Sequence, residues 1–194
     1  MTKPFIHLRT QSSYSLSESS LKIKDIVFQA KKNNMPAIAI TDNNNMFGAF
    51  EFAQECINNN LQPIIGSSIN FVEINNQNNF SQLTFLVKNN IGYQNLLKLS
   101  SISHINNNNA VGVNLEQVKK YSEGLYCFIG GEKNPLLQIN SKNKKKIYQT
   151  IENFKKIFDE NFIFEIQRIK DQVIDNFESD FISLAKKYDI ALIG

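Results

Sequence analysis

Short apolar runs alternate with longer amphipathic segments throughout the 194 residues of this sequence. The run PAIAIT at 36–41 is nearly all apolar, which is typical of a parallel strand covered on both faces. Further strands are expected at 4–10, 62–66, 68–74, 82–88, 124–131, 161–168 and 190–194. Helical periodicity is found at 20–34, 45–60, 91–105, 144–160 and 171–189. This alternation predicts an α/β fold with helices outside a mainly parallel sheet.

Two places depart from a simple strand–helix alternation. The runs 68–74 and 82–88 are separated by the turn-forming residues NNQNN at 75–79, which predicts an antiparallel hairpin within the sheet. The run IALIG at 190–194 has the composition of a buried strand, and in a barrel or an open sheet another element would be expected to cover it. We therefore expect the chain to be part of something longer, with a tolerated terminal strand as the alternative.

Composition limits the classes of protein that remain open. An apolar fraction of 42% and a charged fraction of 20% suit a water-soluble domain, and a net charge of +3 is too small to indicate nucleic acid or membrane as a partner. Cys56 and Cys127 lie inside apolar patterns and are expected to be buried free thiols, as in a cytoplasmic protein. No apolar run is long enough to span a bilayer.

Polar residues at the predicted strand ends are the candidates for chemistry. Asp42 and Asn43 follow the buried run 36–41, and alternation places His7, Arg9 and Gln11 on one face of the first strand. A hydrolytic site with two or three metal ions needs several imidazoles and carboxylates, whereas this sequence has two histidines. The sequence also lacks a G-x-S-x-G elbow, a P-loop and a G-x-G-x-x-G motif.

Several motifs, in order along the chain, resemble one known family. They are FIHLRTQSSYSL, MPAIAITDNNNMFGAFEF, QPIIGSSINFV, LTFLVKNNIGYQNLLKLSS and YSEGLYCFIGG, followed by FIFEIQR and LAKKYDIALIG. Together they resemble the N-terminal polymerase-and-histidinol-phosphatase (PHP) domain of bacterial replicative DNA polymerase III alpha subunits. The resemblance covers residues 1–194 as one domain and implies a distorted, TIM-like β/α barrel whose final elements would lie after Gly194.

The resemblance also implies where a metal site would lie. Metal-retaining members hold their ions with histidines, carboxylates and a cysteine. The ligand positions that fall within this sequence are occupied by Arg9, Gln11, Asp42, Asn43, Ser68, Gln82 and Gly131. Among these, Asp42 alone keeps the family's residue type, so we expect a degenerate site and no metal cofactor. Arg9 is expected to pair with Asp42 in place of a cation, in which case Arg9→Ala would destabilise the domain.

The function implied by the resemblance is that of a non-catalytic module in DNA replication. Its expected partners are the remainder of the alpha subunit and the proofreading exonuclease, with DNA reached only through the parent polymerase. DNA-directed polymerisation, a nucleotidyl transfer served by magnesium, would belong to a core that this chain lacks. Two alternatives stay open, a metal-dependent phosphoesterase such as a 3′–5′ nuclease and a truncated, non-catalytic fragment.

Overall fold

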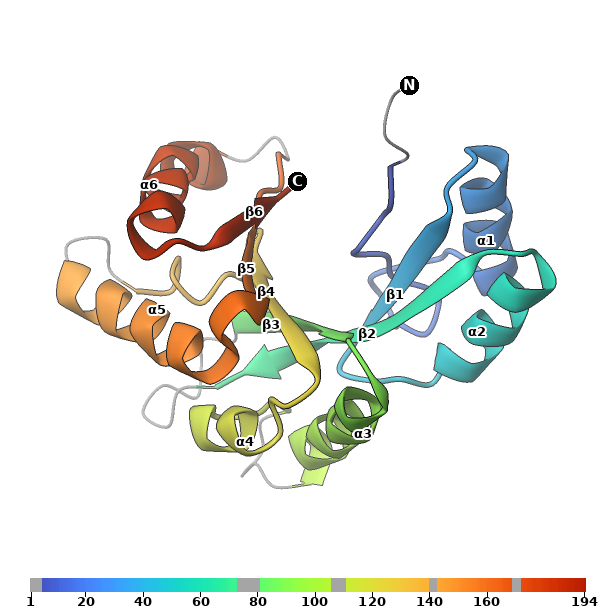
Figure 1. Cartoon of the computed structure of the whole chain (residues 1–194), viewed down its shortest axis with the longest axis horizontal. Coiled ribbons are helices and arrows are strands. Elements are labelled where there is room, and N and C mark those ends of the chain that lie inside the picture. Colours follow the sequence, from blue (N-terminus) through green and yellow to red (C-terminus); the bar gives the residue numbers. More distant parts are fainter. Residues whose placement is uncertain (1–4, 73–80, 106–110, 140–142, 169–171) are drawn as a thin grey trace.

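The computed structural model describes residues 5–72, 81–105, 111–139, 143–168 and 172–194 (Figure 1), and within 172–176 only the backbone. Six strands form one curved sheet in sequence order. They are β1 (Ala37–Asn43), β2 (Gln62–Phe71), β3 (Ser81–Val87), β4 (Leu125–Gly130), β5 (Phe162–Glu165) and β6 (Ala191–Ile193). β3 is antiparallel to both its neighbours, and every other pairing is parallel. The predicted mainly parallel α/β sheet with one antiparallel insert is thus confirmed.

The helices lie on the outer side of this sheet (Figure 1). They are α1 (Ile23–Lys32), α2 (Ala49–Asn58), α3 (Asn90–Ile105), α4 (Leu115–Lys120), α5 (Lys144–Phe158) and α6 (Gln172–Tyr188), with a 3-10 turn, η1, at Asp159–Asn161. Five of them correspond to predicted helices, whereas α4 was not predicted. Within the described ranges, no helix combines the length and the apolar character needed to cross a membrane.

The first predicted strand is wrong as a regular strand. Residues 5–10 run along β1 but do not form a regular ladder with it. The reason is that the backbone hydrogen bonds between them have a different spacing on each segment. The amides of Ala39 and Thr41 donate to the carbonyls of His7 and Thr10 over 2.9 and 2.7 Å. Donors two residues apart therefore meet acceptors three residues apart, a mismatch that a parallel ladder does not allow. Residue 4 lies outside the described residues.

The predicted break between 62–66 and 68–74 is also wrong, since residues 62–71 form the single strand β2, and 73–74 lie outside the described residues. Gly66 lies inside this strand and permits a close approach of β3, because a Cβ atom there would lie 2.4 Å from the Phe85 carbonyl oxygen. The predicted hairpin is confirmed by the antiparallel register of β2 and β3, in which Ile69 faces Leu83. Its turn at 75–79 lies outside the described residues.

The short helix α4 has a local cause that periodicity does not reveal. The Asn114 side chain accepts from the Gln117 amide at 3.0 Å, and the Gln117 side chain accepts from the Asn114 amide at 2.9 Å. This reciprocal capping box satisfies two backbone donors that a helix start would otherwise leave free. With six residues, α4 is too short to show a helical period in the sequence.

The apolar core is divided between the two faces of the curved sheet. On the outer face, α3 to α6 pack over a cluster rich in phenylalanine, and α1 and α2 pack over a second cluster against β1 and β2. The inner face holds a third cluster to which each strand contributes, formed by Ala39, Ile64, Leu86, Tyr126, Phe128, Ile163 and Ile193 together with Leu8. The inner face of the sheet is therefore lined by apolar side chains, five of which are only half-buried.

Both cysteines are buried free thiols, as predicted. Burial raises the pKa of the Cys127 thiol, and burial together with the charge of Glu55 raises that of Cys56 to about 11. Both side chains are therefore neutral thiols at physiological pH and act as small apolar groups in the core.

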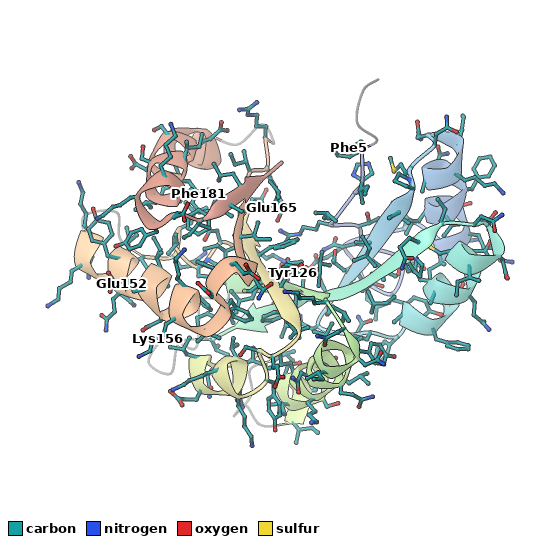
Figure 2. All side chains as sticks on the ribbon, in the orientation of Figure 1. Phe5, Tyr126, Glu152, Lys156, Glu165 and Phe181 are labelled. Atoms are coloured by element: carbon teal, nitrogen blue, oxygen red, sulfur yellow. The ribbon has the colours of Figure 1, made fainter. Side chains whose placement is uncertain are left out.

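Phe164 of β5 offers a test of the outer core. Its ring stacks on that of Phe181 of α6, which is labelled in Figure 2, with centroids 4.1 Å apart. Phe164→Ala should lower the free energy of unfolding by about 3–5 kcal/mol in urea denaturation, because it leaves a cavity between strand and helix. The control Leu192→Ala, in the neighbouring strand at a position 39% exposed, should cost about 1 kcal/mol or less. Equal losses in the two variants would contradict this packing.

Candidate functional site at the mouth of the sheet

Polar side chains gather where β1, β2, β4 and β5 end and the antiparallel β3 begins. The carboxyl ends of parallel strands are the usual place for functional residues in α/β folds. Here we call this end of the sheet the mouth. The loop between the N-terminal segment and α1, residues 11–20, folds over it and supplies several of the side chains described below.

Asp42 lies near the end of β1 and is 2% exposed. Its carboxylate accepts hydrogen bonds from the Ser12 amide, the Ser12 hydroxyl and the Ser15 hydroxyl, each over 2.7 Å. The Ser15 oxygen in turn accepts from the Asn43 amide at 3.1 Å. Asp42 therefore ties the loop 11–20 to β1, and both of its oxygens are already engaged.

The predicted pairing of Arg9 with Asp42 is wrong. The Arg9 guanidinium donates instead to Glu165 at the end of β5, with Nη1 and Oε2 2.9 Å apart. The other Glu165 oxygen accepts from the Gln167 side chain at 2.9 Å. The physical reason is that Ser12 and Ser15 satisfy Asp42, whereas Glu165, labelled in Figure 2, offers Arg9 a carboxylate that is not paired with another cation among the described residues.

Three of the predicted positions meet in a chain of amides. Asn43 Oδ1 accepts from the side-chain nitrogens of Gln11 at 3.0 Å and Gln82 at 3.4 Å. The Gln82 nitrogen also reaches Asn70 Oδ1 at 3.3 Å. The Asn43 nitrogen donates to Glu18, whose second oxygen forms an ion pair with Lys133 Nζ at 3.2 Å. The network thus joins the N-terminal loop to β1, β2, β3 and the segment after β4.

The two remaining predicted positions lie outside this network. The Ser68 hydroxyl, buried on β2, shares a hydrogen bond of 2.9 Å with the hydroxyl of Thr84 on β3. Gly131 follows β4 with φ +67°, and a Cβ atom there would lie 2.3 Å from the side-chain oxygen of Gln167. A larger residue at 131 would therefore displace Gln167 from its contact with Glu165.

The two histidines and Arg168 have separate surroundings. His7 is exposed and packs edge-on against Phe5 with ring centroids 4.7 Å apart. The Nε2 atom of His104 lies 2.6 Å from the Asn44 carbonyl oxygen. Arg168 forms an exposed ion pair with Glu178 at 2.9 Å, and this contact raises the pKa of the guanidinium and lowers that of the carboxyl.

Sequence reasoning missed six residues of the mouth. They are Ser12, Ser15, Glu18, Asn70, Lys133 and Glu165. The two serines belong to the segment RTQSSYSL, in which closely spaced hydroxyls indicate a loop built by side-chain hydrogen bonds. Glu165 and Lys133 meet partners more than 100 residues away in the chain, and no local pattern indicates such contacts.

The donor chemistry of the mouth is that of amides and ion pairs. Among the described residues, no three His, Cys, Asp or Glu side chains are grouped so that they could hold a metal ion. Over the same residues, every buried side-chain nitrogen or oxygen has a hydrogen-bond partner. No orphaned polar atom at the mouth therefore points toward a missing ligand.

The fold and the position of the mouth define a class of protein. The PHP domain family model matches residues 7–169, and the chain belongs to this family. A solved structure of a proposed metal-dependent phosphoesterase from Bifidobacterium adolescentis has the same fold, with a TM-score of 0.63 and 10% identity. It covers 97% of this chain and 85% of its own. An amidohydrolase from Chromobacterium violaceum, with sulfate bound and no metal, gives a TM-score of 0.60 at 11% identity, covering 96% and 84%.

Within the family, the chain is similar to polymerase subunits. DNA polymerase III subunit alpha of Rickettsia bellii is 36% identical over 100% of this chain and 17% of its own length. The same subunit of Borreliella burgdorferi is 39% identical over 89% of the chain and 16% of its own length. The chain thus spans about one sixth of the length of these curated relatives.

The hydrogen bonds of the Asp42 carboxylate can be tested by mutation. Asp42→Ala should lower the free energy of unfolding by roughly 3 kcal/mol in urea denaturation, because three buried donors lose their charged acceptor. Asp180→Ala, which removes an exposed carboxylate from α6, serves as the control and should change stability by about 0.5 kcal/mol or less. A loss below about 1 kcal/mol for Asp42→Ala would show that the loop 11–20 does not depend on it.

The ion pair between Arg9 and Glu165 can also be tested by mutation. A double-mutant cycle with Arg9→Ala and Glu165→Ala should give a coupling energy of about 1 kcal/mol, because each residue contacts the other directly. The matched cycle of Arg9→Ala with Asp42→Asn should be additive to within about 0.5 kcal/mol. Coupling in the second cycle and additivity in the first would restore the pairing expected from the sequence.

Proposed function

We propose that this chain serves as the PHP module of a replicative DNA polymerase III alpha subunit, with a structural mouth in place of a metal centre. In this role it stabilises the polymerase and offers a docking surface for the proofreading exonuclease. Support comes from the family match over residues 7–169 and from the polymerase relatives. Because the chain spans about one sixth of those relatives, polymerisation and DNA contact would belong to the remaining parts of the polypeptide.

The single observation that carries the structural role is the bonding of Asn43. Its side chain has three partners, Gln11, Gln82 and Glu18, and lies beside an Asp42 whose oxygens both accept from serines. A divalent ion bound by a PHP domain needs anionic oxygens and imidazole nitrogens that are free to coordinate. The amides here are neutral and Arg9 brings a positive charge, so this donor set does not fit such an ion.

The mouth performs a mechanical task through the same contacts. Arg9, Gln11 and Glu18, all within the first 18 residues, reach β5, β1 and the segment after β4. These links hold the strand ends in fixed positions. A bound metal ion would also hold strand ends together, in addition to any catalytic role. A mouth of this kind has a structural role and takes no part in hydrolysis. The proposal places the chain in the cytoplasm, where a replicative polymerase acts.

Metal analysis of the chain purified without chelators tests the proposal. Zinc and manganese should each remain well below one equivalent after incubation with excess metal and desalting, and EDTA should leave the melting temperature unchanged. Both results follow from a mouth whose polar groups are bonded to one another. One bound equivalent, together with hydrolysis of a phosphate monoester or of DNA 3′ ends, would favour the metal-dependent phosphoesterase instead.

Sequencing beyond codon 194 tests the polymerase context. An open frame that continues into a polymerase core supports it, and an immediate stop codon supports a truncated fragment.

A further inference from the structure

An apolar surface lies on the outer side of the molecule between α2 and α3, both of which pack on β2. Phe50 and Ile57 of α2 are 72% and 64% exposed, and Leu97 of α3 is 37% exposed. Pro63 and Ile65 of β2 are only half-buried, although β2 is an interior strand of the sheet. We call these five residues the α2–α3 face.

Contacts on the other flanks of the two helices show that these side chains belong to one surface. The flank of α2 away from Phe50 and Ile57 faces the loop 11–20 and α1, because Tyr14 of the loop bonds Glu51 at 3.1 Å and Lys31 of α1 bonds Asn59 at 3.3 Å. On α3, Leu97 shares a flank with His104, seven residues on, which contacts the Asn44 carbonyl just before α2. Figure 1 shows no helix between α2 and α3 beneath β2.

The α2–α3 face is poor in charge compared with the other helical surfaces. α2 and α3 carry the exposed Glu51 and Lys98 and the half-buried Glu55, which accepts from Asn59, and each of the three contacts a residue that is not part of the face. Glu51 bonds Tyr14, and Lys98 Nζ lies 5.6 Å from the centre of the Tyr121 ring. By contrast, α5 exposes Lys144, Lys145, Lys146, Glu152 and Lys156. Apolar residues with depleted charge are characteristic of the buried centre of a protein interface.

We propose that the α2–α3 face is covered by polypeptide that, in an alpha subunit, lies outside these 194 residues. This inference rests on the proposed function, because it takes the occupant from the relatives, of whose length the chain spans 16–17%. Recognition runs through side chains rather than strand addition, since both edges of β2 are paired with β1 and β3. The occupant is therefore a segment with an apolar stripe and few charges, packed against Phe50, Ile57 and Leu97.

Binding in trans tests this proposal. The probe is the Rickettsia bellii alpha subunit with its matching stretch deleted, titrated with the present chain. The double variant Phe50→Ser/Ile57→Ser should bind at least about tenfold more weakly, because it removes the apolar anchors of the interface. The matched control Phe28→Ser changes a side chain that is 62% exposed on α1, and it should bind like the parent chain. Hydrogen exchange should slow in α2 and α3 on binding and stay unchanged in α1.

Any of the following outcomes would overturn the proposal. Absence of binding by the parent chain, equal binding by the double variant, or equal weakening by Phe28→Ser would exclude this face as the contact for that polypeptide. Sedimentation of the chain alone is the second measurement. Self-association that is lost in Phe50→Ser/Ile57→Ser would assign the face to a second copy instead. Failure of the proposed function is distinguishable, because it appears as bound metal with phosphate-ester hydrolysis, whatever the binding result.

Discussion

The unclosed side of the curved sheet is the constraint on which the rest of this structure depends. β1 and β6 are the two ends of the strand order and are not paired with each other. Residues 7–10 run along β1 instead, where Leu8 joins the inner apolar cluster and Arg9 reaches Glu165 on β5. A short segment with no regular ladder therefore bridges the two halves of the sheet, by packing inside and by one ion pair at the mouth.

Amides suit this bridging task for a chemical reason. An Asn or Gln side chain both donates and accepts, so Asn43 can serve Gln11, Gln82 and Glu18 at once. A metal ion would join strand ends through anionic and imidazole ligands, which repel one another or bind protons when the ion is lost. The network here needs no central charge. In each of the ion pairs Arg9–Glu165 and Glu18–Lys133, the positive and negative charges neutralise each other.

The sequence was sufficient for most of the fold and for part of the site. Apolar runs and helical periods located β1, the hairpin of β2 and β3, and the long helices, because these elements bury one face or both. They did not reveal α4, whose capping box is local, or the irregular course of residues 5–10. At the mouth, Gln11, Asn43 and Gln82, which the resemblance gave as positions of a former metal site, lie within hydrogen-bond distance of one another through Asn43. The resemblance could not select Glu165 over Asp42 as the partner of Arg9, because that choice depends on which carboxylate the serines of the loop had already satisfied.

The amide chain from Gln11 through Asn43 and Gln82 to Asn70 has a physiological consequence. Carboxamides neither gain nor lose a proton across the range in which imidazole changes charge, near neutrality. A domain held together by histidines and zinc would loosen when the cell acidifies or when transition metals become scarce. The amide chain contains no group that titrates near neutrality, so under the proposed function its hydrogen bonds keep these strand ends joined whatever the cytoplasmic pH or metal supply.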